Sequence, residues 1–117
     1  MIKDKSFEFA LKIIELYKCL VKSNEYVISK QILRSGTSIG ANVEEASASV
    51  SKRDFIHKMS IASKEARETK YWLKLLNMSS LVDINLDEYL NQIDSIINIL
   101  TKIVKTSQEN LKTKNES

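Results

Sequence analysis

The sequence of residues 86–104 is LDEYLNQIDSIINILTKIV, in which apolar residues recur at intervals of three and four. At about 100° per residue, these positions fall on a single stripe of a helix, roughly 140° wide. A stripe of that width is typical of a helix that packs one side against a bundle. The stretch therefore predicts a long helix with one buried face. The stripe consists of Leu86, Tyr89, Leu90, Ile93, Ile96, Ile97, Leu100, Ile103 and Val104.

Helical spacing continues through most of the remaining chain. The chain has 117 residues, no proline and two glycines, which excludes folds that need many tight turns. We expect one all-α domain over residues 1–117, with Ser51 and Asn85 as helix N-caps. The predicted helices cover about residues 5–21, 25–50, 52–78 and 86–108, and about residues 112–117 are expected to form a frayed polar tail.

Apolar residues cover more of the helix over residues 5–21 than one core requires. They form two adjacent stripes that together span roughly 220°. Apolar surface that remains after one core is complete usually marks a partner surface, so we expect the chain to bind copies of itself. The alternative is that this helix is central in an irregular fold. Ile61, Trp72 and Leu75 lie off the seam of the helix over residues 52–78 and are assigned to the same interface. One stripe consists of Phe7, Ala10, Leu11, Ile14, Tyr17 and Val21, and the stripe assigned to the interface consists of Phe9, Ile13, Leu16 and Leu20.

The helix over residues 25–50 contains both glycines, Gly36 and Gly40, one turn apart on its apolar face. Each glycine destabilises a helix by about 1 kcal/mol relative to alanine. A neighbouring helix that approaches closely would offset this. Polar residues run beside this face, and they can be buried only if they form hydrogen bonds. We interpret them as a network that fixes helix register; the alternative is a site for a polar ligand. The predicted network consists of Arg34, Ser38, Asn42 and Glu45.

Residues 34–46, RSGTSIGANVEEA, resemble the signature of the four-helix-bundle family encoded in intervening sequences of bacterial 23S rRNA genes. Ser38, Ile39, Asn42 and Glu45 stand where that family has Ser-Ile-x-x-Asn-(Ile/Val)-x-Glu. Gly40 stands where many relatives carry proline. A second block, within residues 55–73, is similar to the pattern of the family's third helix. Its matching residues are Phe55, Met59, Ile61, Ala62, Glu68 and Leu73.

This resemblance implies an up-down-up-down antiparallel four-helix bundle that assembles into a closed homo-oligomer, typically a pentamer. It implies no known catalytic activity. A related branch of the family serves as an accessory to the reverse transcriptases of diversity-generating retroelements, where a basic oligomer is thought to bind RNA or the polymerase.

Positive charge gathers in the third quarter of the chain. The whole chain has 18 lysines and arginines against 15 acidic residues, a net charge of +3, and residues 51–80 alone carry +4. Lys52, Arg67, Lys70 and Lys74 share one face of the predicted helix within roughly 60°. Such a face can bind phosphates, or it can simply be solvated. We predict binding to RNA or a ribonucleoprotein. The alternative is a protein-binding adaptor for a partner enzyme such as a reverse transcriptase, without contact to nucleic acid.

Residues for catalysis or metal binding are scarce. The chain has one histidine, in Asp54-x-x-His57, whereas carboxylate di-iron bundles need two such motifs. The lone Cys19 is not paired with a base that would activate a nucleophile. We therefore predict no enzyme activity and no cofactor. The single cysteine fits a reducing compartment, so we expect a cytoplasmic protein, and the sequence has no apolar run of the ~18 residues that a membrane span needs.

Overall fold

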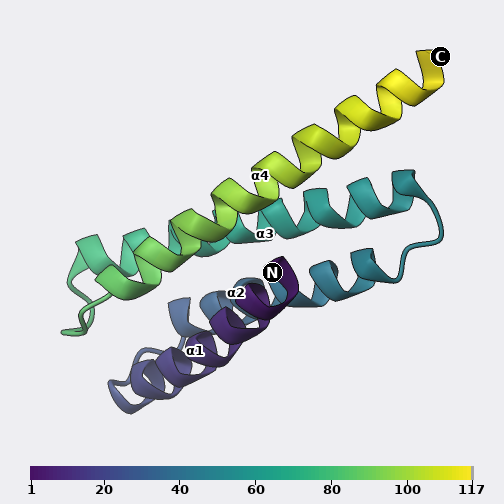
Figure 1. Ribbon diagram of the computed structural model, residues 1–117. Helices are drawn as coiled ribbons and strands as arrows, with labels where there is room; N and C mark the ends of the chain where they lie inside the picture. Colours follow the sequence, from purple (N-terminus) through teal and green to yellow (C-terminus); the bar gives the residue numbers. More distant parts are fainter. Residues whose placement is uncertain (117) are drawn as a thin grey trace.

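The computed structural model describes the backbone of residues 1–116 and the side chains of residues 1–113. Residues 1–116 contain no β-strand, which confirms the predicted all-α class. Residues 1–116 form four helices, as expected from the sequence, and Figure 1 shows their arrangement. They are α1 (Ile2–Lys22), α2 (Ile28–Ser47), α3 (Lys52–Ser79) and α4 (Asp87–Glu116).

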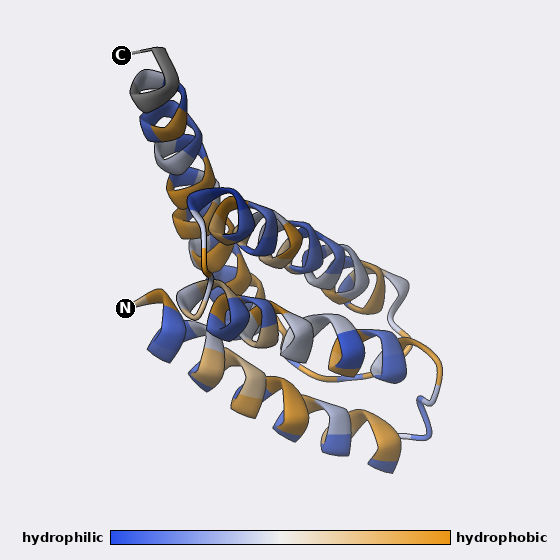
Figure 2. Cartoon of the chain, turned by 90° about the vertical axis from the view of Figure 1, so that its right-hand side faces the viewer, coloured by the Kyte–Doolittle hydropathy of each residue, from blue (hydrophilic) through white to orange (hydrophobic). Residues whose placement is uncertain are grey.

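Each helix packs mainly against the helices that precede and follow it in the sequence. α2 lies between α1 and α3, α3 also packs along α4, and α1 touches α4 over only a short stretch. The molecule is elongated, with extents of 56 × 23 × 21 Å. The C-terminal part of α4 projects beyond the other helices (Figures 1 and 2). Figure 2 also shows hydrophobic and hydrophilic residues on every helix, as expected for amphipathic helices that share one core.

α2 is shorter than the predicted range of residues 25–50 at both ends, and a side chain caps its N-terminal end. The carboxylate of Glu25 accepts hydrogen bonds from the backbone N–H groups of Val27, Ile28 and Ser29 at 3.1, 2.9 and 2.6 Å. Glu25 therefore caps the helix from outside it. Burial by itself would raise the pKa of the Glu25 carboxyl, but these hydrogen bonds lower the pKa below its ordinary value.

The predicted N-cap of α3 is confirmed, and the predicted end of α4 is wrong. Ser51 Oγ accepts a hydrogen bond from the Asp54 N–H at 3.1 Å. Asn85 Oδ1 likewise accepts from the Asp87 N–H at 3.0 Å, just before α4. α4 continues to Glu116, through most of the predicted polar tail over residues 112–117, whose last residue lies outside the described residues. The tail is polar, but it contains no proline or glycine that would end a helix.

The core is built from one stripe of each helix, and on α1 this is the stripe that the sequence analysis assigned to an oligomer interface. Phe9, Ile13, Leu16 and Leu20 are 0–2% exposed and pack with the buried residues of the other helices. The prediction that these four residues form an interface is therefore wrong. The physical reason is the direction of α1: its first apolar stripe faces outward beside α2, whereas the second faces the centre of the bundle.

The three α3 residues of the predicted interface differ from one another. Ile61 is half-buried, and Trp72 is half-buried against the core. The Trp72 indole N–H donates a hydrogen bond to Glu68 Oε2 at 3.1 Å. Only Leu75, which is 38% exposed, lies open on the surface. Trp72 thus serves mainly the fold of the single chain, whereas an interface role of Ile61 and Leu75 stays a prediction.

Candidate functional site

The predicted basic residues of α3 lie along the edge that α3 shares with α4. An Nη2–H of Arg67 donates a hydrogen bond to Thr101 Oγ1 of α4 at 3.0 Å. Lys70 Nζ forms an ion pair with Asp94 Oδ1 of α4 at 2.6 Å. This pair partly neutralises Lys70, so its charge is less available to a ligand than that of Arg67.

The other two predicted residues lie nearer the ends of the same edge. Lys52 borders a recess of about 160 Å³ together with Phe55, Ser107 and Asn110. Lys74 is exposed. The four basic residues thus lie along one edge of α3, and their binding to nucleic acid stays a prediction.

A groove runs between α3 and α4 around Arg67, with a volume of about 270 Å³. α4 contributes a second cation, Lys105, which the sequence analysis did not identify. The described residues that line the groove include no carboxylate. Besides the two cations they are Ser60, Ser63, Thr101, Val104 and Gln108. The groove can therefore offer positive charge from two helices and neutral hydrogen-bond donors between them.

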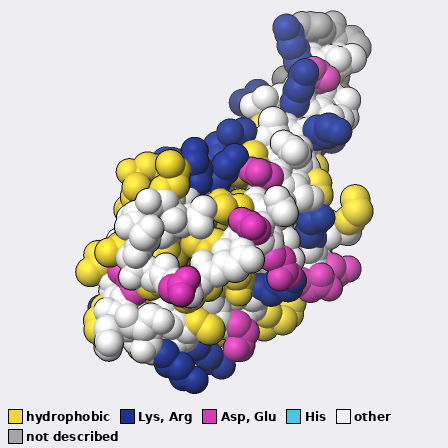
Figure 3. Space-filling view, turned by 90° about the vertical axis from the view of Figure 1, so that its left-hand side faces the viewer, with side chains coloured by type: hydrophobic (Ala, Val, Ile, Leu, Met, Phe, Trp, Pro, Cys, Tyr) yellow, Lys and Arg dark blue, Asp and Glu magenta, His cyan; other side chains and the backbone are white. Residues whose placement is uncertain are grey.

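Lysines and arginines also gather on the projecting end of the molecule, toward the C-terminus of α4 (Figure 3). The broad part of the same view exposes many hydrophobic side chains. Tyr26, Val27, Met78 and Leu81 are among the exposed hydrophobic residues near the connections at this end of the bundle. Charged side chains of both signs lie among these hydrophobic residues in the same view.

The polar residues of α2 that were predicted to form a network instead form separate contacts. Arg34 bonds to Glu65 Oε2 of α3 at 3.3 Å and also pairs with Glu68. Asn42 Nδ2 donates to the Ser38 backbone carbonyl at 2.9 Å and to Ser38 Oγ at 3.2 Å.

Glu45 pairs with Lys58 of α3 at 3.1 Å, and both Arg34 and Glu45 are exposed. No hydrogen bond between described residues joins the Ser38–Asn42 pair to either ion pair. The network prediction is wrong in this respect, because the polar strip faces the solvent-exposed seam between α2 and α3 and needs no continuous network.

A buried polar contact lies elsewhere. Ser35 and Thr69 are both 0% exposed, and their hydroxyl oxygens are 2.9 Å apart between α2 and α3. The Ser35 hydroxyl also lies 2.9 Å from the Gln31 carbonyl, and the Thr69 hydroxyl 2.8 Å from the Glu65 carbonyl. This contact fixes the register of two helices and is inaccessible to a ligand.

The exposed apolar surface of α1 lies beside α2. Phe7, Leu11 and Ile14 are 61, 51 and 36% exposed. Together with Thr37, Gly40 and Ala41 of α2, they line a groove of about 310 Å³, whose rim carries the ion pair between Lys3 and Glu44 at 3.6 Å. Surfaces of this kind usually mark a contact with a partner. This groove replaces the core stripe of α1 as the candidate interface.

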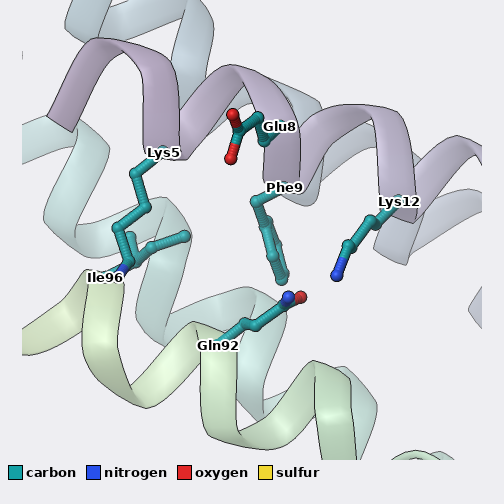
Figure 4. A pocket seen from close by; sticks show the side chains of 6 residues that line it. All are labelled: Lys5, Glu8, Phe9, Lys12, Gln92 and Ile96. Carbon is teal, nitrogen blue, oxygen red and sulfur yellow. The ribbon is translucent and has the colours of Figure 1, made fainter. Parts of the chain in front are cut away.

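A small cavity of about 160 Å³ separates α1 from α4 where the two helices barely touch (Figure 4). Lys5, Glu8, Phe9 and Lys12 of α1 face Gln92 and Ile96 of α4. Gln92 Oε1 is buried and has no hydrogen-bond partner among the described residues. The mixed charges and the orphaned amide oxygen suit ordered water better than a charged ligand.

The described residues offer little for catalysis or metal binding. Their histidine, cysteine and acidic side chains form no group of three that could hold a metal ion. His57 and Cys19 are both exposed. Among the described helices, none is both long and apolar enough to cross a membrane.

Comparison with known proteins agrees with the motif of α2. The sequence matches a family model described as 23S rRNA-intervening sequence protein over residues 1–102. A solved structure from Bacteroides thetaiotaomicron VPI-5482, a protein of unknown function from the S23 ribosomal protein family, is 51% identical. The match covers 89% of this chain and 95% of that one, with a TM-score of 0.84. No curated protein matches the sequence. The resemblance indicated by residues 34–46 is therefore confirmed.

Proposed function

Because this chain belongs to the 23S rRNA-intervening sequence protein family, we propose that it is a non-enzymatic protein that assembles with copies of itself and binds RNA, free or within a ribonucleoprotein. The groove between α3 and α4 carries this proposal. Arg67 and Lys105 flank it from two helices, and its remaining lining residues are neutral. Phosphate groups need positive charge and hydrogen-bond donors, and both are present in the groove.

Assembly strengthens the RNA proposal. A ring or other closed oligomer repeats the groove in each copy, so that weak individual contacts act together. The contact between copies is assigned to the α1 groove around Phe7, Leu11 and Ile14, which exposes apolar surface that a single chain leaves uncovered. The family resemblance implies an up-down-up-down antiparallel protomer and five copies. We place the protein in the cytoplasm, where the free thiol of Cys19 stays reduced.

The test is the salt dependence of RNA affinity. Fluorescence anisotropy with a labelled structured RNA should show binding at low salt, and log K should fall linearly with log[salt]. Arg67→Gln with Lys105→Gln should weaken binding to all sequences alike and reduce the slope by roughly 0.7–0.9 for each phosphate that the protein no longer neutralises. The control is Lys22→Gln with Lys30→Gln, which removes the same charge from exposed positions on α1 and α2. Equally weakened binding in both double variants would mean that net charge alone, and not the groove, holds the RNA.

A second function is favoured by the apolar α1 groove. The same surface fits an apolar segment of a partner protein, for example a reverse transcriptase, and would make the chain an adaptor. Binding of this kind buries apolar area and responds little to salt. If the wild-type protein binds no RNA even at low salt, the nucleic-acid proposal fails and the adaptor becomes the better account.

A further inference from the structure

We propose that the exposed ring of Tyr71 is a stacking platform for an unpaired base, so that the RNA bound along α3 is single-stranded. The inference rests on the proposed function, because the cations that would hold the neighbouring phosphates belong to the same basic edge. The inference specifies the class of RNA that binds along the basic edge of α3. The groove alone does not distinguish a single strand from a duplex, because both carry phosphates.

The Tyr71 ring is exposed and held in place. Tyr71 is 56% exposed on the outer face of α3. Its ring lies edge-to-face against Trp72, with centroids 5.2 Å apart and an interplanar angle of 70°. Trp72 packs against the core, and its indole N–H bonds to Glu68 at 3.1 Å. A ring braced by an anchored neighbour has less conformational entropy to lose when a base stacks on it.

Positive charge flanks Tyr71 on both sides along the helix. Arg67 precedes it by four residues and Lys74 follows it by three, so each lies about one turn away, with Cβ atoms about 5–6 Å apart. Lys64 lies one turn beyond Arg67. All three cations are exposed. Their long side chains can reach the phosphates on either side of a base that stacks on Tyr71.

This combination distinguishes a single strand from other partners. In an RNA duplex the base faces are already stacked on one another, so only an unpaired base can stack on an aromatic ring. A second copy of the chain is disfavoured, because the cores of protein interfaces are depleted of lysine and the exposed Lys64 and Lys74 lie along α3 on either side of this ring. The exposed Leu75 and Met78 extend the apolar patch by one to two turns toward the end of α3, where a ribose or a second base could lie.

The experiment compares a short labelled oligouridylate with an RNA duplex by fluorescence anisotropy at low salt. Tyr71→Ala should weaken oligouridylate binding roughly 5- to 150-fold, the effect of removing one stacked base, and should change duplex binding less than twofold. Tyr71→Phe, which keeps an aromatic face, should bind like wild type. Tyr26→Ala is the control, since Tyr26 is another exposed tyrosine, at 52%, on the connection between α1 and α2. Oligouridylate should also quench the fluorescence of Trp72, the single tryptophan of the chain.

Each contrary outcome overturns the inference in a different way. If Tyr71→Ala binds both RNAs like wild type while the Arg67→Gln/Lys105→Gln variant binds them weakly, the platform is disproved and the phosphate groove remains. If Tyr71→Ala stays helical by circular dichroism but no longer assembles in light scattering, the ring belongs to a contact between copies. If wild type binds neither RNA, the platform fails together with the proposed function. Loss of binding in Tyr71→Phe as well would show that the hydroxyl, and not stacking, is required.

Discussion

Replacing Gly36 by alanine should destabilise the fold relative to the same replacement at Gly40. A Cβ at Gly36 would lie 2.9 Å from both Cγ1 and Cγ2 of Ile13, a residue that is 0% exposed in the core. A Cβ at Gly40 would meet its nearest neighbour, the backbone carbonyl oxygen of Ser6, at 3.4 Å. Real Cβ contacts are rarely as short as the first distance, whereas the second is close to ordinary van der Waals contact.

The magnitude follows from two opposing terms. Alanine favours a helix over glycine by about 1 kcal/mol at either position. The clash occurs only at Gly36, and both Cγ atoms of Ile13 branch directly from its Cβ, so they cannot move away without a shift of α1 or a strained rotamer. Overpacking of this kind destabilises by ~1–3 kcal/mol. The helix term is shared, so Gly36→Ala should be less stable than Gly40→Ala by the overpacking term alone, ~1–3 kcal/mol.

Urea unfolding monitored by circular dichroism measures this difference in the free energy of unfolding, with all variants at one protein concentration. Gly40→Ala should be up to about 1 kcal/mol more stable than wild type. In a double-mutant cycle with Ile13→Ala, the double variant should lose less stability than the sum of the two single losses, since the clash disappears when both Cγ atoms are removed. If Gly36→Ala is as stable as Gly40→Ala, the close approach of α1 and α2 at Gly36 does not constrain the fold.

Three further variants test the remaining conclusions. Leu11→Lys should abolish assembly in light scattering while leaving circular dichroism unchanged, because Leu11 is 51% exposed in the single chain; assembly like that of wild type would place the interface elsewhere. The pKa of the Glu25 carboxyl lies below 4.5 in the folded state, so its stabilisation is present above pH 4.5 and is lost as the pH falls through the folded-state pKa. Glu25→Gln should therefore be less stable by roughly 1 kcal/mol at neutral pH and equal to wild type in acid, and identical pH profiles in thermal unfolding would refute this. Thr69→Val should destabilise by no more than about 1.5 kcal/mol in urea unfolding, since Ser35 keeps a backbone acceptor on α2; a larger loss of stability would show that the hydroxyl pair matters more than its geometry indicates.

The sequence predicted the helices and the width of their apolar stripes, but not which part of each stripe faces the core. Periodicity gives the angle between residues on one helix, such as Phe7 and Phe9, and does not indicate which of two adjacent apolar stripes meets the neighbouring helices. The sequence therefore predicts an excess of apolar surface on α1, but it does not indicate which of the two stripes stays exposed. The motif around Ser38 and Asn42 identified the family correctly because it is local in sequence.

Features that depend on the alignment of two helices could not be predicted in the same way. Lys105 enters the groove because α4 places it near Arg67, and that register is set by the connection over residues 80–86. The contact between Ser35 and Thr69 likewise joins two positions separated by 34 residues. A single sequence contains no signal for such pairs, because each partner alone has ordinary helical spacing.

The packing of each helix against its sequence neighbours also bears on how the chain folds as it is synthesised. Native contacts in this arrangement are local, and chains with local contacts fold in microseconds to milliseconds, far faster than a ribosome adds residues. Once α2 has left the exit tunnel it finds α1 already present, and α3 and then α4 add to the pair in turn. Most of each apolar stripe therefore needs to wait only for the next helix, and the part of α1 around Phe9 that faces α4 is covered last.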